Sequence, residues 1–189
     1  MTARSLLAAL ACVLIAGCSH LSETIDTTPL PTVASPPYIC EYIPLNAVQQ
    51  MTGLQDPLTE GQFTIDKETG YRGGACGVYQ PTGEQLKALS IFLNSSGDPE
   101  QVNTEIRNGA KHLPEIIPGG VGYYAPRKYR DVLGAVAVLI WKDYMLVVEM
   151  GRGAEGRNHE EDVVALMRLI APRLLTEPDT PPHVTQKGG

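Results

Sequence analysis

An aromatic and basic stretch in the second half of the chain has the side-chain types of a candidate ligand-binding surface. Residues 123–130 read Tyr-Tyr-Ala-Pro-Arg-Lys-Tyr-Arg. The candidate contact residues are Tyr123, Tyr124, Arg127, Lys128, Tyr129 and Arg130. Basic groups beside aromatic faces bind sugars or anionic head groups through cation–π contacts and charge-assisted hydrogen bonds. The alternative is a strand edge and a hairpin turn with ordinary solvated charges.

Residues 151–156 form a literal G-x-G-x-x-G sequence between a predicted strand and a predicted helix. Such glycines bring backbone amides close to the pyrophosphate of a dinucleotide. That fingerprint also needs a second parallel strand after the helix, and an acidic residue about 20 positions further on. The acid would be Glu177, which lies in a polar tail containing proline. We therefore interpret these residues as a flexible loop.

Residues 159–162, His-Glu-Glu-Asp, suggest a metal site at first sight. Adjacent residues on a helix point in different directions, so they make a poor chelate. Acidic side chains at a helix N-terminus are favoured by the helix dipole, which is the simpler interpretation. The chain contains no G-x-S-x-G, H-E-x-x-H or S-x-x-K sequence. We assign no catalytic residue and expect no metal and no cofactor.

The first seventeen residues have the composition of an export leader. Arg4 gives a positive start, and residues 5–16 are almost wholly apolar. This run is shorter than the roughly 20 residues of a membrane-spanning helix, and its length fits a signal peptide. Residues 15–18, Ile-Ala-Gly-Cys, resemble the lipobox of bacterial lipoproteins, in which the cysteine takes diacylglycerol and becomes the first residue.

We therefore predict a lipoprotein signal peptide at residues 1–17 and lipidation of Cys18, with fatty acyl chains such as palmitate. Two acyl chains anchor a protein stably, because each buried methylene contributes about 0.8 kcal/mol. The alternative is an ordinary secretory leader with an incidental cysteine. The predicted location is the outer face of the cell membrane.

Two cysteines remain outside the leader and the lipobox, because Cys12 lies within the leader. In an exported chain, Cys40 and Cys76 are expected to form one disulfide. The bridge would close a loop of 36 residues, which stabilises the fold by roughly 3–4 kcal/mol. A metal site or a catalytic thiol is the alternative, although the chain has no Cys-x-x-Cys sequence.

The remaining chain divides into a tether, one domain and a tail. Residues 18–37 are rich in threonine and proline and are expected to be an extended tether, reaching at most roughly 60 Å at about 3.1 Å per residue. The domain is expected at residues 38–176, and a disordered polar tail at 177–189. Without Arg4, 14 basic residues face 21 acidic residues, a net charge of −7 that argues against a nucleic-acid partner.

Hydrophobic patterns within the domain predict an α+β fold. Helices are expected at residues 44–51, at 98–112 after the Asp98-Pro99 start, and from Asn158 until Pro172 kinks or ends the helix. Strands are expected at 62–67 and 77–80 around a Gly73-Gly74 turn, at 86–93, and as a hairpin at 134–141 and 144–150. The apolar run 134–141 predicts a central strand covered on both faces. We expect an antiparallel sheet of about five strands, packed by two or three helices.

Several of these features together resemble the cell-envelope lipoproteins of actinobacteria, notably mycobacterial ones, that carry an uncharacterised two-cysteine α+β domain. The shared features are Cys18, the Thr/Pro tether, Cys40 before a short helix, and Cys76 at the opening of a strand. The resemblance covers about residues 18–175. It implies an acylated Cys18 and a Cys40–Cys76 disulfide, and it transfers no catalytic residues.

These observations favour a membrane-anchored, non-catalytic binding or accessory module of the cell envelope. Its site is expected in a groove between helix and sheet, or at the stretch 123–130. The alternatives are an enzyme that acts on envelope lipid or glycan, and an assembly partner of other envelope proteins. The expected partners are the membrane, through the diacylglyceryl group on Cys18, and an envelope lipid, glycan or protein.

Overall fold

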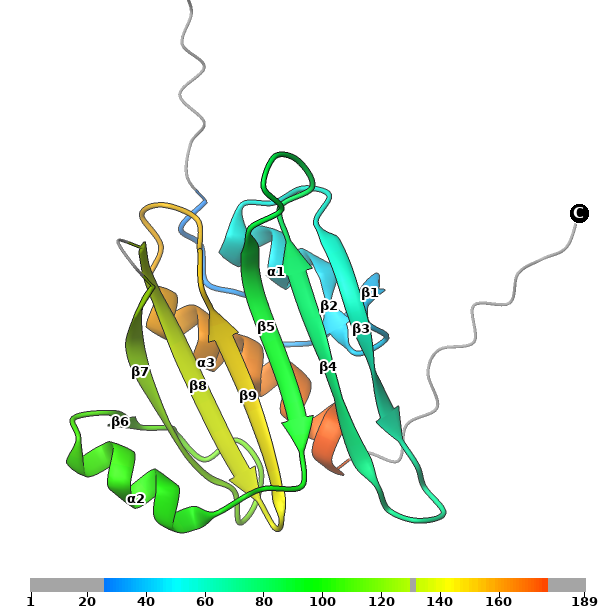
Figure 1. Cartoon of the computed structure of the whole chain (residues 1–189), viewed down its shortest axis with the longest axis vertical. Coiled ribbons are helices and arrows are strands. Elements are labelled where there is room, and N and C mark those ends of the chain that lie inside the picture. Colours follow the sequence, from blue (N-terminus) through cyan, green and yellow to red (C-terminus); the bar gives the residue numbers. More distant parts are fainter. Residues whose placement is uncertain (1–25, 130–131, 177–189) are drawn as a thin grey trace, which may run out of the picture.

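A seven-stranded antiparallel sheet forms the centre of the structure, a computed structural model that describes residues 26–129 and 132–176 (Figure 1). The strand order across the sheet is β3-β4-β5-β9-β8-β7-β6. These strands are β3 (Leu58–Ile65), β4 (Arg72–Tyr79), β5 (Lys87–Asn94), β6 (Lys111–His112), β7 (Val121–Tyr129), β8 (Val132–Trp141) and β9 (Tyr144–Met150).

The remaining elements are a small two-stranded sheet and three helices within the described residues. They are β1 (Tyr38–Ile39), β2 (Ile43–Pro44), α1 (Leu45–Thr52), α2 (Pro99–Arg107) and α3 (His159–Ala171). The α+β class and the antiparallel pairing are confirmed. The expected number of about five strands was wrong, because β6 and β7 were not recognised as strands of the main sheet and because β1 and β2 form a second sheet.

Strand β8 is covered on both faces, as its unbroken apolar sequence predicted. Ala135, Ala137 and Leu139 belong to the main core, on the side of α3. Val136, Val138 and Ile140 alternate with them and belong to a second, smaller cluster that contains Val102 of α2. Since neighbouring side chains of a strand point to opposite faces, α3 and α2 lie on opposite sides of the sheet.

Helix α3 begins and ends where its sequence indicates. The Asn158 side chain accepts a hydrogen bond from the Glu161 backbone N–H at 3.4 Å, which caps the first turn. The α-helix ends at Ala171, and the chain continues from Pro172 to Thr176 as a π-helical turn. The helix buries Val163, Leu166, Met167 and Ile170 completely against the sheet.

Several element boundaries differ from those expected: β3 and β4 begin earlier than residues 62 and 77, and α2 ends earlier than residue 112. Glycine accounts for two of these differences. Helix α2 ends at Arg107 instead of residue 112, because Gly109 adopts a positive φ of 98° and the next residues pair with β7 as strand β6. Gly73 and Gly74 lie inside β4 rather than in a turn. A Cβ on Gly74 would come within 2.2 Å of the Gln62 carbonyl oxygen of β3, so glycine permits this strand pairing.

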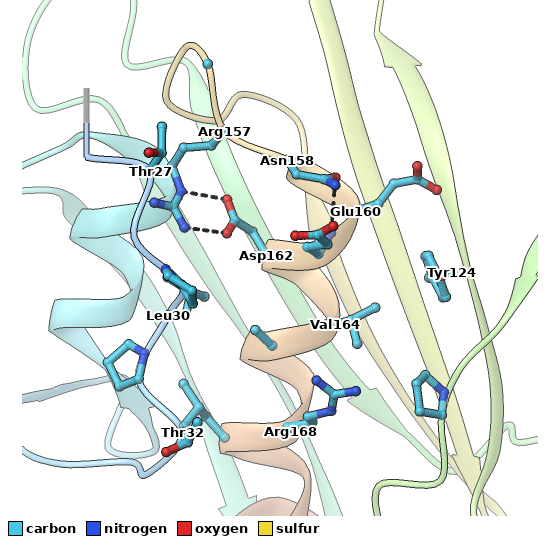
Figure 2. A pocket seen from close by; sticks show the side chains of 17 residues that line it. Thr27, Leu30, Thr32, Tyr124, Arg157, Asn158, Glu160, Asp162, Val164 and Arg168 are labelled. Atoms are coloured by element: carbon cyan, nitrogen blue, oxygen red, sulfur yellow. Dashed lines mark hydrogen bonds and ion pairs between the residues drawn. The ribbon is translucent and has the colours of Figure 1, made fainter. Parts of the chain in front are cut away.

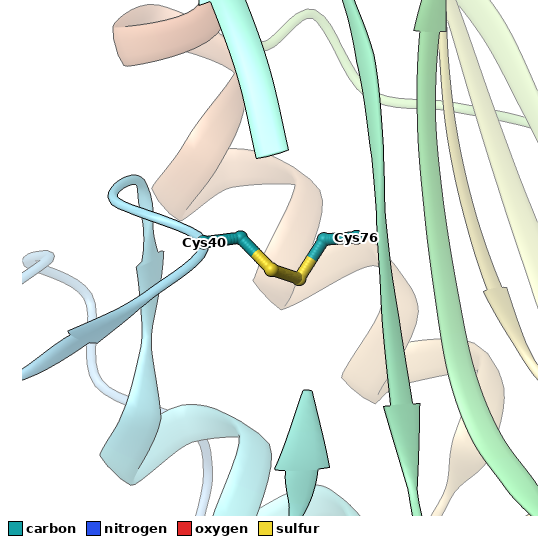
Figure 3. The surroundings of a disulfide bond; sticks show 2 residues. All are labelled: Cys40 and Cys76. Carbon is teal, nitrogen blue, oxygen red and sulfur yellow. A yellow bond between two sulfur atoms is a disulfide. The ribbon is translucent and has the colours of Figure 1, made fainter. Parts of the chain in front are cut away.

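The disulfide between Cys40 and Cys76 is present, which confirms the predicted pair (Figure 3). It joins the turn between β1 and β2 to the middle of β4, with the two Cα atoms 6.0 Å apart. Cys76 is 1% exposed and lies in the main core. The bridge therefore fixes the small sheet over the same face of the large sheet that α3 covers.

Residues 26–32, here named the strap, pack against the domain ahead of β1. Leu30 is 5% exposed and belongs to the main core. The Gln50 amide of α1 donates to the Thr28 carbonyl oxygen at 2.9 Å. We expected residues 18–37 to be tether, so the packed chain extends further toward the N-terminus than the expected start at residue 38. The expectations for residues 1–25 and 177–189 lie outside the described residues.

Candidate functional site

The aromatic and basic stretch does not form one surface, because strand β7 sends its neighbouring side chains to opposite faces. Tyr123 is 4% exposed and packs beneath α2 with Val102. Burial, together with the negative charge of Glu105, raises the pKa of the Tyr123 phenol. Tyr124 is half-buried on the other face, beside the main core. The two tyrosines therefore serve different environments.

Arg127 and Lys128 are exposed near the β7–β8 turn, as the ligand hypothesis requires. The side chain of Tyr129 and the whole of Arg130 lie outside what the structure describes. Binding of an anionic ligand at Arg127 and Lys128 stays a prediction. Tyr123 no longer belongs to the predicted ligand surface, because its ring packs against α2.

The glycine-rich loop 151–156 joins β9 to α3 and is shaped by close packing. A Cβ on Gly153 would come within 2.6 Å of the His159 ring. The Ala154 backbone N–H donates to the Met51 carbonyl oxygen of α1 at 2.9 Å. These contacts give a structural reason for the glycine at position 153 and tie the loop to α1.

The four residues 159–162 point in different directions, as adjacent helical positions do, and three of them have separate partners. The two ring nitrogens of His159 lie 3.0 and 3.2 Å from the carbonyl oxygens of Leu133 and Ala154, and the N–H of the ring donates to one of them. Glu160 pairs with Lys111, and Asp162 pairs with Arg157. Within residues 26–129 and 132–176, no three His, Cys, Asp or Glu side chains gather in a way that could hold a metal ion.

A cavity of about 640 Å³ lies along the outward face of α3, and we name it the α3 groove (Figure 2). Its floor is the side of α3 that carries Val164, Ala165, Arg168 and Leu169. The strap forms one wall through Pro29, Leu30 and Pro31, and Pro114 and Tyr124 form the other. Apolar atoms form most of the groove surface, as is usual in a small-molecule site, and several charged side chains of α3 and of the loop before it also line the groove.

The strap wall is held by a buried ion pair at the start of α3. Arg157 donates to both carboxylate oxygens of Asp162, at 2.8 and 2.6 Å, and the two side chains are 3% and 5% exposed. The hydrogen bond to Asp162 raises the pKa of the Arg157 guanidinium. The same guanidinium donates to the carbonyl oxygens of Asp26 and Thr28, at 2.5 and 3.0 Å. Arg157 therefore couples the strap to α3, and Asp162 fixes Arg157 in place.

The opposite wall carries a second ion pair, which is more exposed. The Lys111 ammonium lies 3.0 Å from Glu160 Oε2 and 5.5 Å from the centre of the Tyr124 ring. Its hydrogen bond to Glu160 raises the pKa of Lys111. The other carboxylate oxygen, Glu160 Oε1, is shielded from solvent and has no hydrogen-bond partner among the described residues.

Arg168 lines the groove two turns further along α3. Figure 2 shows Glu160 and Arg168 toward opposite ends of the groove, with Val164 between them on the helix. The Arg168 side chain is exposed, and no hydrogen bond or ion pair ties it to another residue of the described chain. The groove thus has the Arg168 guanidinium, unpaired among the described residues, at one end and the Glu160 and Glu161 carboxylates at the other.

A second hollow lies on the other side of the strap and is larger and more polar. Its volume is about 1,090 Å³, and its lining includes Asn46, Gln49, Gln50 and Gln55. The Gln49 and Gln50 amides are already hydrogen-bonded to backbone carbonyl oxygens. The α3 groove is the better candidate, because its walls are apolar and its free polar groups lie at defined positions.

The sequence predicted a ligand site in a groove between helix and sheet, and this stays a prediction. Among the described residues that line the α3 groove, only Tyr124 belongs to a strand. The buried stripe of α3 was recognisable, and it leaves positions 161, 164, 165 and 168 on the outward face. Nothing in the local pattern of residues 26–32 showed that Leu30 enters the core, because prolines flank it on both sides. The strap wall, and hence the cavity, became visible only in the folded chain.

Comparison with known proteins places no constraint on the site. No protein-family model, no curated protein and no solved structure matches the chain. Among the helices of the described residues, none is long and apolar enough to cross a membrane.

Proposed function

We propose that this chain is a membrane-anchored, extracytoplasmic lipoprotein of the actinobacterial, mycobacterial type. In this proposal Cys18 carries the diacylglyceryl anchor, and the domain is a non-catalytic binding or accessory module of the cell envelope. The α3 groove is its ligand site. The observation that carries the proposal is that the strap, which continues toward Cys18, forms one wall of an apolar cavity.

The packing of the strap brings this site close to the proposed anchor. Eight residue steps separate Cys18 from Asp26, the first residue that the structure describes. Even fully extended, eight residues span at most about 29 Å. A ligand drawn from the envelope would therefore meet the groove near the membrane surface, rather than at the end of a 60 Å tether.

Lipidation is tested by labelling cells with a radioactive or clickable fatty acid. We expect the parent chain to carry the label and Cys18→Ala to lose it, because the lipobox thiol is the acceptor. Cys12→Ala is the matched control and should keep the label, since Cys12 lies inside the leader. Full labelling of the Cys18→Ala chain would refute the anchor.

The groove is tested by filling it. Ala165→Trp places an indole on the groove floor, whereas Leu133→Trp adds the same group at a position that is 65% exposed and outside the groove. The full chain and both variants are incubated with lipid, glycan and peptide fractions of the envelope, and bound species are identified by native mass spectrometry. We expect Ala165→Trp to lose a species that the parent and Leu133→Trp retain. Identical bound species in all three proteins would overturn the groove as the site.

One observation favours an assembly role as a second candidate. Helix α2 packs against β7 and β8 on its side of the sheet, and Phe92 of β5 is 37% exposed on that same side. An envelope protein could cover this open area. If it does, Phe92→Glu should abolish a specific cross-link between the two proteins and leave ligand binding in the groove unchanged.

A further inference from the structure

The α3 groove presents opposite charges at a fixed separation. Glu160 and Arg168 both line it and lie eight residues apart on the same helix. At 1.5 Å per residue, their backbone positions are separated by about 12 Å along the helix axis. Val164 lies midway between them, and side chains four residues apart share a helix face. The ligand is therefore expected to lie along α3 and to reach both charged groups.

At the Glu160 end of the groove, one carboxylate oxygen has no hydrogen-bond donor among the described residues. Lys111 satisfies Glu160 Oε2, but Oε1 is buried from solvent without a partner. A buried acceptor without a donor is destabilising, and such groups are rare in native proteins. Glu161 also lines this end and adds a second carboxylate. An ammonium group in the groove would match the negative charge of these carboxylates, and it would supply Oε1 with a donor once the Glu160 side chain turns this oxygen toward the groove.

The Arg168 end of the groove presents an exposed hydrogen-bond donor. The guanidinium has no partner within the described chain, and its planar donor fork matches a carboxylate in a bidentate arrangement. The space between the two ends is lined by Leu30, Val164, Leu169 and prolines of both walls. Such a channel suits a narrow backbone that carries small apolar side chains.

We propose that the α3 groove binds a short zwitterionic peptide in extended form, with its α-ammonium group at Glu160 and its α-carboxylate at Arg168. An extended chain rises about 3.3 Å per residue, so about four residues span the groove. This inference rests on the groove being the ligand site of the proposed function, and it adds the chemical class of the ligand.

Charge complementarity favours this ligand over the other envelope chemistries. An amphiphile with a phosphate head would match Arg168 but would leave Glu160 Oε1 without a donor. A sugar would stack on an aromatic face. Among the described residues that line the groove, the only aromatic ring is that of Tyr124, which already has the Lys111 ammonium 5.5 Å from its centre. A peptide with two free termini satisfies both ends at once.

The test measures binding of defined peptides to the full chain by isothermal titration calorimetry. The probes are tetra-alanine, N-acetyl-tetra-alanine and tetra-alanine amide. We expect tetra-alanine to bind, and each blocked peptide to bind at least tenfold more weakly, because each lacks one terminal charge. Di-alanine is too short to reach both ends and should also bind at least tenfold more weakly.

Variants assign each terminus to its residue. Arg168→Met should weaken the binding of tetra-alanine, but it should leave the already weak binding of tetra-alanine amide unchanged. Glu160→Gln should weaken tetra-alanine and leave the N-acetyl peptide unchanged. Arg107→Met is the matched control, since Arg107 lies on α2, outside the groove, and its loss should not alter binding.

The outcomes separate this inference from the groove itself. Two results would overturn the zwitterionic peptide as the ligand but keep the groove as the site. One is equal affinity for the free and blocked peptides. The other is no peptide binding while Ala165→Trp still removes an envelope species. No peptide binding together with no species removed by Ala165→Trp overturns both proposals.

Discussion

The two faces of the central sheet differ in how completely they are covered. One face is closed by several packed elements, and the other is covered only in part. The face under α3 is closed by α1, α3, the small sheet, the strap and the disulfide. The opposite face carries α2 over β7 and β8, and Phe92 stays partly exposed beyond it. The candidate groove lies on the outer side of the closed layer, so its floor is a helix that the core keeps rigid.

In this arrangement the proposed ligand site is formed by elements that also stabilise the fold. Arg157 holds the strap to α3, and the strap is both a core element through Leu30 and a groove wall through Pro29 and Pro31. On the opposite face, by contrast, α2 covers a smaller buried cluster, and Phe92 beyond it stays partly exposed. Substitutions on the two faces should therefore differ in their effect on the free energy of unfolding.

The largest effect is expected from Arg157→Met, which leaves the Asp162 carboxylate buried without its partner. Breaking one side of a buried ion pair costs about 3–5 kcal/mol. Urea unfolding of the variant measures this loss. Lys111→Met is the matched control, because the Lys111–Glu160 pair is exposed and solvent screens it, so its loss should lower the free energy of unfolding far less. Equal losses in the two variants would contradict the role of the Arg157 clamp.

Removal of the disulfide should come next in size. The double change Cys40→Ala and Cys76→Ala opens a 36-residue loop and should lower the free energy of unfolding by roughly 3–4 kcal/mol. The oxidised parent and the variant are compared by chemical unfolding. A variant as stable as the parent would show that the bridge adds nothing to the closed face.

A pair of neighbours on β5 compares the two faces directly. Ile91 is fully buried on the α3 side, and Phe92 is 37% exposed on the other side. Ile91→Ala should cost about 2–5 kcal/mol because it leaves a cavity in the core. Phe92→Ala should cost clearly less, about 1 kcal/mol, although it removes the larger side chain. The comparison fails if Phe92→Ala is the more destabilising change.

The smallest effect concerns the pH dependence of the strap. A hydrogen bond from the Thr28 hydroxyl lowers the pKa of Asp26. A carboxyl with a depressed pKa in the folded state contributes stability above its unfolded pKa, and this contribution is lost as pH falls through the folded value. Amide hydrogen exchange in residues 26–32 should therefore accelerate, relative to the core strands, when the pH falls below about 4. In Asp26→Asn this acceleration should be absent.

The sequence predicted the fold best where one residue pattern decides one element. The apolar run of β8, the Asn158 cap of α3 and the pair Cys40 and Cys76 were each confirmed by the structure. The prediction from sequence failed where contacts between distant residues decide the local structure. Gly73 and Gly74 are typical of a turn, yet close pairing with β3 places them in a strand.

The candidate site was harder to predict, since it is formed by residues that lie far apart in the chain. Arg157 and Thr28 are separated by 129 positions, and Lys111 and Glu160 by 49. Residues that are neighbours in the sequence were wrongly expected to share one surface. The alternation of side chains along a strand places Tyr123 and Tyr124 on different faces. A composition rich in tyrosine and arginine therefore indicated a surface that the strand geometry divides.

The central claim is that the α3 groove, walled by the strap, is the ligand site. The most direct measurement is the map of backbone amide shifts in the NMR spectrum of the full chain when tetra-alanine or an active envelope fraction is added. We predict shifts in residues 27–32, in residues 160–169 and at Tyr124, with none at Arg127 or Lys128. Shifts confined to Arg127, Lys128 or the open face around Phe92, with the strap unchanged, would contradict the claim.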